Sequence, residues 1–339
     1  TALFLVSAIA TRQLVANSHR LSTLDIPNER SSHLTPTPRG GGIAFVATSL
    51  AGFLLLLLNN TLDNAEFLAL CCAGIIVADV FLPPIDKLPD EGELIKIDEP
   101  AHHVGGCASN TAIALSKLGK KAGIIGMVGS DSIGEQLIEL LINEKIDTNA
   151  VIKTKEASTS QTIIVSVKNQ DRRYIHYFGA NSKISVSDID NGLHGYSYPN
   201  QKKILIFGGY LLMPNIDSKE LADFFKKLKD QNYIIILDIA VINNQTGVSD
   251  KIKDVLPFVD YFFPNVDESF QITNLEKPQD QAKCFMDWGA KAIAITCGTE
   301  GVFFKDLENV YQLEPYKIDF VDGSGSGDAF TAGMAIGIS

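Results

Sequence analysis

The sequence predicts an α/β fold, in which a mostly parallel sheet is covered by helices on both faces, and two observations lead to it. Beyond residue 80, short apolar runs typical of buried parallel strands recur along the chain. Segments with helical periodicity separate these runs, as expected of strand–helix–strand units. The strand-like runs cover residues 122–128, 203–207, 233–238, 261–263 and 292–296. The helical segments include residues 133–144, 218–231 and 278–288.

The first 65 residues break this alternation and predict a hydrophobic helical segment. Residues 41–58 are an uncharged apolar run, long enough for a transmembrane helix. All 23 lysines lie at position 87 or later, whereas four of the six arginines lie in the first 39 residues. The predicted organisation is a membrane-associated segment over residues 1–65, followed by one α/β domain over residues 66–339. The arginines before the apolar run would lie on the cytoplasmic side of a membrane.

Charge and cysteine usage exclude several classes of protein. The net charge of −11 and the isoelectric point near 5.0 argue against nucleic-acid binding. The five cysteines show no Cys-x-x-Cys spacing, so the sequence predicts neither a zinc site nor a disulfide framework. Such usage fits a reducing compartment, and we expect the α/β domain to be cytoplasmic.

A glycine-rich turn near the end of the chain carries the clearest chemical signal. Residues 321–330 read Val-Asp-Gly-Ser-Gly-Ser-Gly-Asp-Ala-Phe and run into an apolar helix. Gly325 and Gly327 can leave backbone N–H groups free to bind an anion at the helix N-terminus. Asp328 could then take a proton from a hydroxyl that attacks phosphorus. A plain connector that ends in a capping aspartate would show the same letters, so the motif alone leaves both interpretations open.

A second glycine motif precedes a predicted amphipathic helix. The stretch Gly105-Gly-Cys-Ala-Ser-Asn110 leads into a helix that ends at Gly119, a typical C-terminal cap. The paired glycines would allow close approach of the backbone to a ligand. Upstream, Gly74 and Asp79 stand at the end of an apolar run that reads as a strand.

Two further segments have both a functional and a structural interpretation. Asn265-Val-Asp-Glu268 follows Phe-Phe-Pro264 and precedes a helix, so it could bind a ligand or simply form a capping box. Residues 161–168 and 173–178 flank a polar turn and predict a β-hairpin. His102, His103 and Cys107 have no partners at metal-ligand spacing, and we expect no metal site there.

Together these motifs resemble the PfkB-type, ribokinase-like carbohydrate kinases over about residues 70–339. The resemblance also includes Gly126-Met-Val-Gly-Ser-Asp-Ser-Ile-Gly134, Gly179-Ala-Asn181, Gly208-Gly209 and Thr296-Cys-Gly-Thr-Glu-Gly301, in the family's order. It implies a ribokinase-like fold and ATP-dependent phosphorylation of a sugar or nucleoside hydroxyl. The glycine-rich turn departs from the family pattern at Gly323 and Ser326, and its glycines are intact.

The resemblance also implies roles for individual residues. Asp328 would be the general base, and Gly325, Ser326 and Gly327 would form the anion hole. The acceptor sugar would be bound by Asp79, Gly105, Gly106, Asn110 and Asn181. The nucleotide ATP would be bound by Asn265, Glu268, Thr296, Gly298 and Gly301. Magnesium would be held largely through phosphates and water, so we expect no metal site built of protein ligands alone.

The hairpin would belong to a small β lid, together with strands near residues 94–104. Closure of a lid excludes water from the site and limits wasteful hydrolysis of ATP. The resemblance also implies a homodimer formed through this lid.

The N-terminal segment resembles a different family, the membrane polyprenyl-phosphate sugar-1-phosphate transferases (glycosyltransferase family 4). The resemblance rests on the loop at residues 24–43 and on the apolar stretch at residues 67–78. The Asp-Asp pair expected after that stretch is absent, so we expect no transferase activity. Residues 66–82 could then be either a third membrane helix or the first strand of the kinase, and they cannot be both. A chimeric or truncated reading frame would explain this conflict.

The sequence therefore favours an ATP-dependent sugar kinase, and three alternatives remain open. These are a fragment of a membrane sugar-1-phosphate transferase, a protein that binds sugar without catalysis, and an inactive chimeric product. The chain stops at Ser339, about three turns into the helix that Asp328 opens. From this we expect the kinase domain to be truncated and its ATP binding to be weakened. The acceptor itself cannot be read from these residues.

Overall fold

The computed structural model describes residues 69–168, 170, 172–196, 202–242, 245–318 and 323–338. It also describes the backbone of two short antiparallel strands, β1 (Leu24–Asp25) and β2 (Thr37–Pro38). Within these residues, no helix has the length and apolar character needed to cross a membrane. The predicted membrane helix at residues 41–58 lies outside the described part of the chain.

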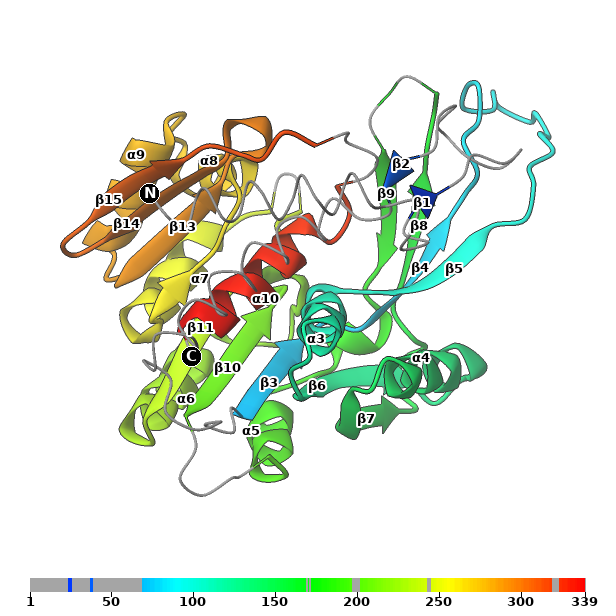
Figure 1. Ribbon diagram of the computed structural model, residues 1–339. Coiled ribbons are helices and arrows are strands. Elements are labelled where there is room, and N and C mark those ends of the chain that lie inside the picture. The colour runs from blue at the N-terminus through cyan, green and yellow to red at the C-terminus, as the bar shows by residue number, and fades with distance from the viewer. Residues whose placement is uncertain are drawn as a thin grey trace.

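A nine-stranded sheet forms the body of the molecule, as Figure 1 shows. Its spatial order is β15 (Val310–Leu313), β14 (Val302–Asp306), β13 (Ala292–Thr296), β12 (Tyr261–Phe262), β11 (Tyr233–Leu237), β10 (Lys203–Gly208), β3 (Ala69–Gly74), β6 (Ala122–Gly129) and β7 (Asp147–Thr154). All neighbouring pairs from β13 to β7 are parallel, and β14 and β15 add an antiparallel edge. The predicted mostly parallel sheet is confirmed.

Helices follow the strands and pack on both faces of the sheet. They are α3 (Cys107–Lys117), α4 (Ser132–Asn143), α5 (Val186–His194), α6 (Ser218–Asp230), α7 (Val248–Val255), α8 (Val266–Thr273), α9 (Pro278–Asp287) and α10 (Ser326–Ile338). Short 3₁₀ turns lie at η1 (Gly179–Ser182), η2 (Tyr210–Leu212), η3 (Leu256–Phe258) and η4 (Gly298–Glu300). Several helix starts are fixed by side chains; for example, the Asp217 carboxylate accepts hydrogen bonds from the backbone of Lys219 and Glu220 at the start of α6.

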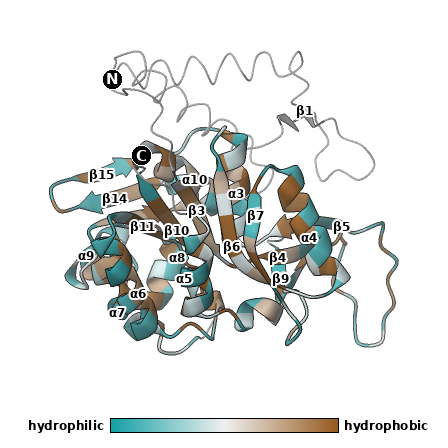
Figure 2. Cartoon of the chain, turned by 90° about the horizontal axis from the view of Figure 1, so that it is seen from below, coloured by the Kyte–Doolittle hydropathy of each residue, from teal (hydrophilic) through white to brown (hydrophobic). Residues whose placement is uncertain are grey.

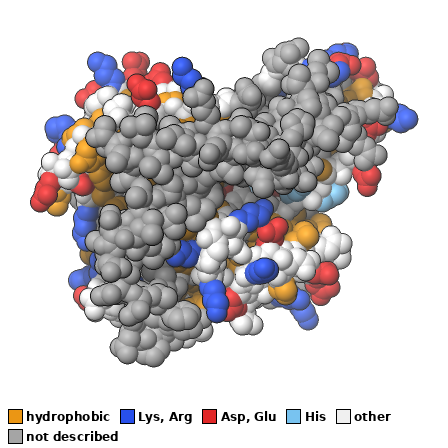
Figure 3. All heavy atoms as spheres, in the orientation of Figure 1, with side chains coloured by type: hydrophobic (Ala, Val, Ile, Leu, Met, Phe, Trp, Pro, Cys, Tyr) orange, Lys and Arg blue, Asp and Glu red, His pale blue; other side chains and the backbone are white. Residues whose placement is uncertain are grey.

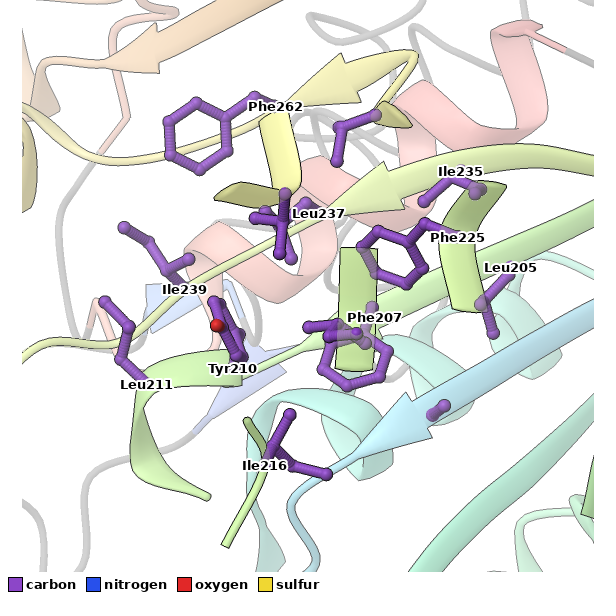
Figure 4. Close-up of a cluster of buried hydrophobic side chains, with 14 of the residues drawn as sticks. Leu205, Phe207, Tyr210, Leu211, Ile216, Phe225, Ile235, Leu237, Ile239 and Phe262 are labelled. Carbon is purple, nitrogen blue, oxygen red and sulfur yellow. The ribbon is translucent and has the colours of Figure 1, made fainter. Parts of the chain in front are cut away.

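Strand β10 shows how the sheet separates two hydrophobic cores. Ile204 and Ile206 point into one core, which also holds apolar side chains of α3, α4 and α10. Leu205 and Phe207 point to the opposite face and pack among residues of α5 to α9. Figure 4 shows this second core around Phe207 and Phe225. Burial on both faces explains why the strands are continuous apolar runs, which appear brown in Figure 2.

A second, four-stranded sheet projects from the body and contains the strands of the predicted lid, so we call it the lid sheet, or lid. Its order is β5 (Ala101–Gly105), β4 (Val77–Phe81), β8 (Gln161–Val165) and β9 (Arg173–Tyr177). Strands β8 and β9 pair antiparallel, so the predicted hairpin is confirmed. The strand expected near residues 94–104 begins only at Ala101. On the face shown in Figure 3, acidic and basic side chains are interspersed on the described surface.

The apolar stretch near residue 70 is sheet and not membrane helix. Strand β3 lies in the middle of the large sheet, where it pairs with β10 on one side and β6 on the other. The chain then turns at Gly74 and continues as β4 into the lid. Of the two alternatives for residues 66–82, the described residues 69–82 therefore support the first strand of the kinase and exclude a third membrane helix. The placement of Asp79 at the end of the first strand is wrong, because Asp79 lies within β4.

Candidate active site

The site lies at the carboxyl ends of the parallel strands, where the order of the sheet reverses. From β3 the chain proceeds through β6 to β7 on one side, whereas β10 to β13 extend on the other. Ligands of open α/β sheets bind in the crevice at such a switch point. Here Gly74 and Gly208 lie opposite each other. A Cβ atom on Gly74 would lie 2.0 Å from the Gly208 carbonyl oxygen, and the φ of Gly74 is +144°. Only glycine can occupy position 74, where the two strands approach each other so closely.

The Gly105–Gly106 pair brings the start of α3 against the lid. A Cβ on Gly105 would lie 1.9 Å from Oδ2 of Asp79. Gly106 has a φ of +93°, and a Cβ there would lie 2.5 Å from the Ile75 carbonyl oxygen. The two glycines therefore permit close packing among α3, the turn after β3, and the carboxylate of Asp79.

Asp328 lies in the first turn of α10, facing α3. Its Oδ2 accepts a hydrogen bond from Nδ2 of Asn110 at 2.9 Å, across 218 residues of sequence. The residue as a whole is half-buried, and its carboxylate is the enclosed part. Burial raises the pKa of Asp328 to about 6, against the lowering effect of hydrogen bonds from Asn110 and Cys107. The carboxylate is therefore mainly ionised above about pH 6 and could accept a proton at neutral pH.

The glycine-rich turn offers fewer free amides than the sequence analysis expected. Gly325 has a φ of +73°, which glycine adopts without strain. The Ser326 N–H donates to the Gly323 carbonyl at 3.1 Å, so this amide is occupied. No acceptor for the Gly325 or Gly327 amide is found within the described residues. The predicted anion hole of three amides thus reduces to Gly325 and Gly327 in this conformation.

A cluster of two carboxylates and a thiol lies beneath the turn. Ligand atoms of Cys107, Asp238 and Asp328 all lie within 4.8 Å of one another. Asp238 directly follows β11 and is only 7% exposed. Burial raises its pKa well above the ordinary value, and the charges of Asp328 and Glu268 raise it further. Burial and the neighbouring charges therefore disfavour the ionised form of Asp238 within the cluster.

Asn265 and Glu268 form a complete capping box at the start of α8. Oδ1 of Asn265 accepts from the Glu268 N–H at 2.8 Å, and the Asn265 N–H donates to Oε2 of Glu268 at 2.9 Å. The structural interpretation of this motif is confirmed, and it leaves the ligand role open. Burial raises the pKa of Glu268 to about 7, despite the hydrogen bond from the Asn265 backbone.

The remaining predicted nucleotide residues surround the turn after β13. Thr296 ends that strand, and its N–H donates to the Pro264 carbonyl at 3.1 Å, which places it beside Asn265. A Cβ on Gly298 would meet nothing within 4 Å, so the space around it is open. A Cβ on Gly301 would lie 1.9 Å from the Leu313 carbonyl oxygen, so this glycine is also required for strand packing.

Asn181 is wholly buried, and its side chain forms hydrogen bonds with the backbone of another residue. Its Nδ2 donates to the Ile76 carbonyl at 3.0 Å, and its Oδ1 accepts from the Ile76 N–H at 3.3 Å. Ile76 lies in the turn that joins the large sheet to the lid. These contacts explain a polar side chain at this position without a ligand.

A comparison with families of known proteins decides the family of this chain. The model of the pfkB family carbohydrate kinases matches residues 68–339. The chain belongs to the pfkB carbohydrate kinase family. Its activity is the phosphorylation of a sugar with ATP, and the glycine-rich turn with Asp328 lies within the matched residues.

Several relatives of this pfkB kinase support the assignment. Ribokinase of Staphylococcus aureus is 25% identical over 260 residues, which cover 74% of this chain and 80% of that protein. The 2-dehydro-3-deoxygluconokinase of Bacillus subtilis is 27% identical over 259 residues, covering 73% of this chain and 78% of the relative. The structure of Arabidopsis thaliana ribokinase with ribose and ATP superposes with a TM-score of 0.65. It is 21% identical and covers 81% of this chain and 86% of that one.

Sequence reasoning missed two parts of the site of this pfkB kinase. Asp238 was recognised only as the end of an apolar run, although an acidic residue at the carboxyl edge of a parallel sheet is itself a signal. The second part is a hydrogen-bonded pair in the lid, Thr162 and His176, whose side chains lie 3.0 Å apart. No local sequence pattern predicts this pair, because the two residues come together only when the hairpin folds.

Proposed function

We propose that the chain transfers the γ-phosphoryl group of ATP to a hydroxyl of a sugar or nucleoside, with Asp328 as the general base. The observation that supports this most directly is the Asp328 carboxylate itself. It is enclosed at the start of α10, oriented by Asn110, and lies beside two glycine amides that have no acceptor within the described residues.

The chemistry follows from these groups. The ionised Asp328 accepts the proton of the substrate hydroxyl as its oxygen bonds to the γ-phosphorus. The bond from that phosphorus to the β–γ bridging oxygen breaks, and its electron pair leaves with ADP. The Gly325 and Gly327 amides, at the positive end of the α10 dipole, would stabilise the charge on the transferred group.

The residues present fit a magnesium nucleotide. ATP supplies the phosphoryl group, and Mg²⁺ neutralises the charge on its phosphates. Asn265 and Glu268 would help to place the phosphates and the ion, the latter through water. Thr296, Gly298 and Gly301 would line the nucleotide site, with the open space at Gly298 facing the ligand. The Asp328 carboxylate, which is mainly ionised at neutral pH, gives this end of the site a negative charge that suits a cation.

The acceptor would lie between the lid and α3. Asp79 and Asn110 would bind its hydroxyls, since a carboxylate accepts from a diol and an amide can donate and accept. Gly105 and Gly106 would allow its close approach. We assign Asn181 to positioning of the turn at Ile76, which follows from the two hydrogen bonds between them.

The lid would exclude water when it closes, and it would also serve for dimerisation. Nη1 of Arg172, in the hairpin, donates a hydrogen bond to Oγ of Ser324, so the lid contacts the glycine-rich turn. Ile163 of β8 and Ile175 of β9 are directly paired and are 40% and 61% exposed, which suits a surface that pairs with a second lid. Sedimentation of the full chain would test the dimer, and a purely monomeric protein would contradict it.

For the N-terminal part we retain a division into a segment over residues 1–65 and a kinase domain over 66–339. The apolar run at residues 41–58 would associate with the membrane, as in the transferases that it resembles, and the kinase domain would face the cytoplasm, where ATP is available. Flotation of the full chain with lipid vesicles tests this association.

The test of the kinase activity is release of ADP by the full chain with Mg²⁺, against a panel of sugars and nucleosides. Asp328→Asn should lower kcat by about 100- to 10,000-fold, the usual contribution of a general base. Asp250→Asn, on the exposed surface of α7, is the matched control and should not change kcat.

Two outcomes would favour the alternatives. If Asp328→Asn binds an acceptor as wild type does, and neither protein releases ADP, the chain is a sugar-binding protein. If a folded wild-type chain neither binds nor turns over any acceptor, the inactive product is correct.

A further inference from the structure

A row of polar side chains crosses the whole lid sheet at one level. The strand registers place His103 of β5 opposite Asp79 of β4, Asp79 opposite Thr162 of β8, and Thr162 opposite His176 of β9. Directly paired residues point to the same face of a sheet. All four side chains therefore share the face that carries Asp79, the predicted sugar ligand.

Three members of this row form a directed hydrogen-bond chain. The strand register sets the Thr162 hydroxyl beside the Asp79 carboxylate, which when ionised can only accept, so the single hydroxyl proton is directed toward it. Its oxygen then can only accept from Nδ1 of His176, at 3.0 Å. Nδ1 therefore carries the hydrogen of the imidazole.

The remaining ring nitrogen of His176 has no partner. Nε2 is buried, and no hydrogen bond to it is found within the described residues. Burial lowers the pKa of His176, so the ring is neutral at pH 7 and Nε2 is a bare acceptor. Its ring packs edge-on against Phe178, with centroids 5.2 Å apart, which fixes its orientation. A buried polar atom without a partner costs free energy unless something satisfies it.

We propose that Nε2 of His176 accepts a hydrogen bond from a hydroxyl or N–H of the acceptor substrate, and that the part of the substrate against this row is uncharged. This inference rests on the proposed kinase function and narrows its substrate class. The acceptor is then a neutral sugar or nucleoside, and not a sugar acid or sugar phosphate whose charged group lies under the lid.

The charges around the row support this choice. A carboxylate or phosphate placed against Thr162 would meet the Asp79 carboxylate on one side and the lone pair of His176 on the other. Neither group can donate to it at neutral pH. Arg172 lies over the Phe81 ring and donates a hydrogen bond to Ser324, at the phosphoryl end of the site.

The experiment uses two substitutions that distinguish the contributions of the two ring nitrogens of His176. His176→Asn keeps a polar group near the position of Nδ1 and removes Nε2, whereas His176→Gln places a polar atom near Nε2. We expect His176→Asn to raise KM for the acceptor about 5- to 20-fold, with kcat and KM for ATP little changed, as for a lost hydrogen bond. His176→Gln should recover most of this loss. Asp250→Asn, on the exposed surface of α7, should have no effect.

Matched acceptors test the charge requirement in the same full-length protein. D-ribose is compared with D-ribose 5-phosphate, D-glucose with D-gluconate, and adenosine with its 5′-phosphate, by both ADP release and calorimetric binding. The inference predicts that the neutral member of a pair is used or bound better by at least tenfold. Binding keeps the test valid if turnover is absent, so failure of the kinase activity is distinguished from failure of this inference.

Three results would overturn it. One is an unchanged acceptor KM or Kd in His176→Asn, which would mean that water or packing alone satisfies Nε2. Another is preference for the charged member of a pair. The third is a folded chain that binds no neutral member of the panel.

Discussion

The Asp328 carboxylate has to be ionised to act as a base, and its surroundings make ionisation difficult. Its pKa is raised to about 6, mainly by burial, so the protonated form dominates below that pH. We therefore expect kcat/KM to fall about tenfold per pH unit below pH 6, whereas an ordinary aspartate would keep activity to about pH 4. The pH profile of ADP release between pH 4.5 and 8 measures this.

Asn110 provides the control for that profile, because its hydrogen bond lowers the pKa of Asp328. Asn110→Ala removes the donor, so the acid limb should move to higher pH. A limb that stays in place would assign it to another group, such as Asp79 or Glu268, whose pKa values burial also raises, to about 6 and about 7.

At the scale of elements, the capping box of α8 allows the structural role of Asn265 to be tested separately from a role in nucleotide binding. Asn265→Ala removes the acceptor for the Glu268 N–H and should cost about 1 kcal/mol of unfolding free energy. Asp217→Ala does the same at α6, away from the site, and is the matched control. If Asn265 also places the nucleotide, only Asn265→Ala should raise KM for MgATP, by about tenfold. Equal KM values in both variants would leave Asn265 as a cap alone.

The elements themselves were largely predictable, and the exceptions have a common cause. Buried strands such as β10 and β11 were recognised because both faces pack against helices, which leaves a continuous apolar run. The same property made β3 ambiguous, since a short apolar run is also compatible with a membrane helix. Pairing with β6 and β10 shows that it is a strand, and those partners lie 52 and 134 residues away in the sequence, beyond any local pattern.

At the scale of the whole molecule, the site is assembled from long-range contacts that no motif encodes. The glycine motifs indicated which residues matter, and the contact of Asn110 with Asp328 spans 218 residues. Asp238 enters the site only because β11 ends beside α10. The row from His103 to His176 depends on the register of three strand pairs. Sequence therefore identified residues with a local backbone signature, and missed those defined by packing alone.

The burial of Asp328 also makes the stability of the whole molecule depend on pH. The ionised form, which is needed for function, is the less stable one. Because burial raises the pKa of Asp328 to about 6, the folded chain holds this proton more tightly than the unfolded chain between pH 4 and 6. The contribution of Asp328 to the free energy of unfolding therefore falls as pH rises through this window, by about 1–3 kcal/mol in total. Asp328→Asn lacks this charge and should become more stable than wild type above pH 6, while it loses activity.

Chemical unfolding of the two proteins at pH 4.5 and pH 7 measures the effect. As pH rises, the unfolding free energy of Asp328→Asn should increase relative to that of wild type, because only wild type must ionise a buried carboxyl group. Asp250→Asn, which alters an exposed carboxylate, should show no such trend. If wild type instead gains stability over Asp328→Asn toward pH 7, then the Asn110 and Cys107 hydrogen bonds outweigh burial, and the carboxylate is held as a stabilised ion rather than a strained base.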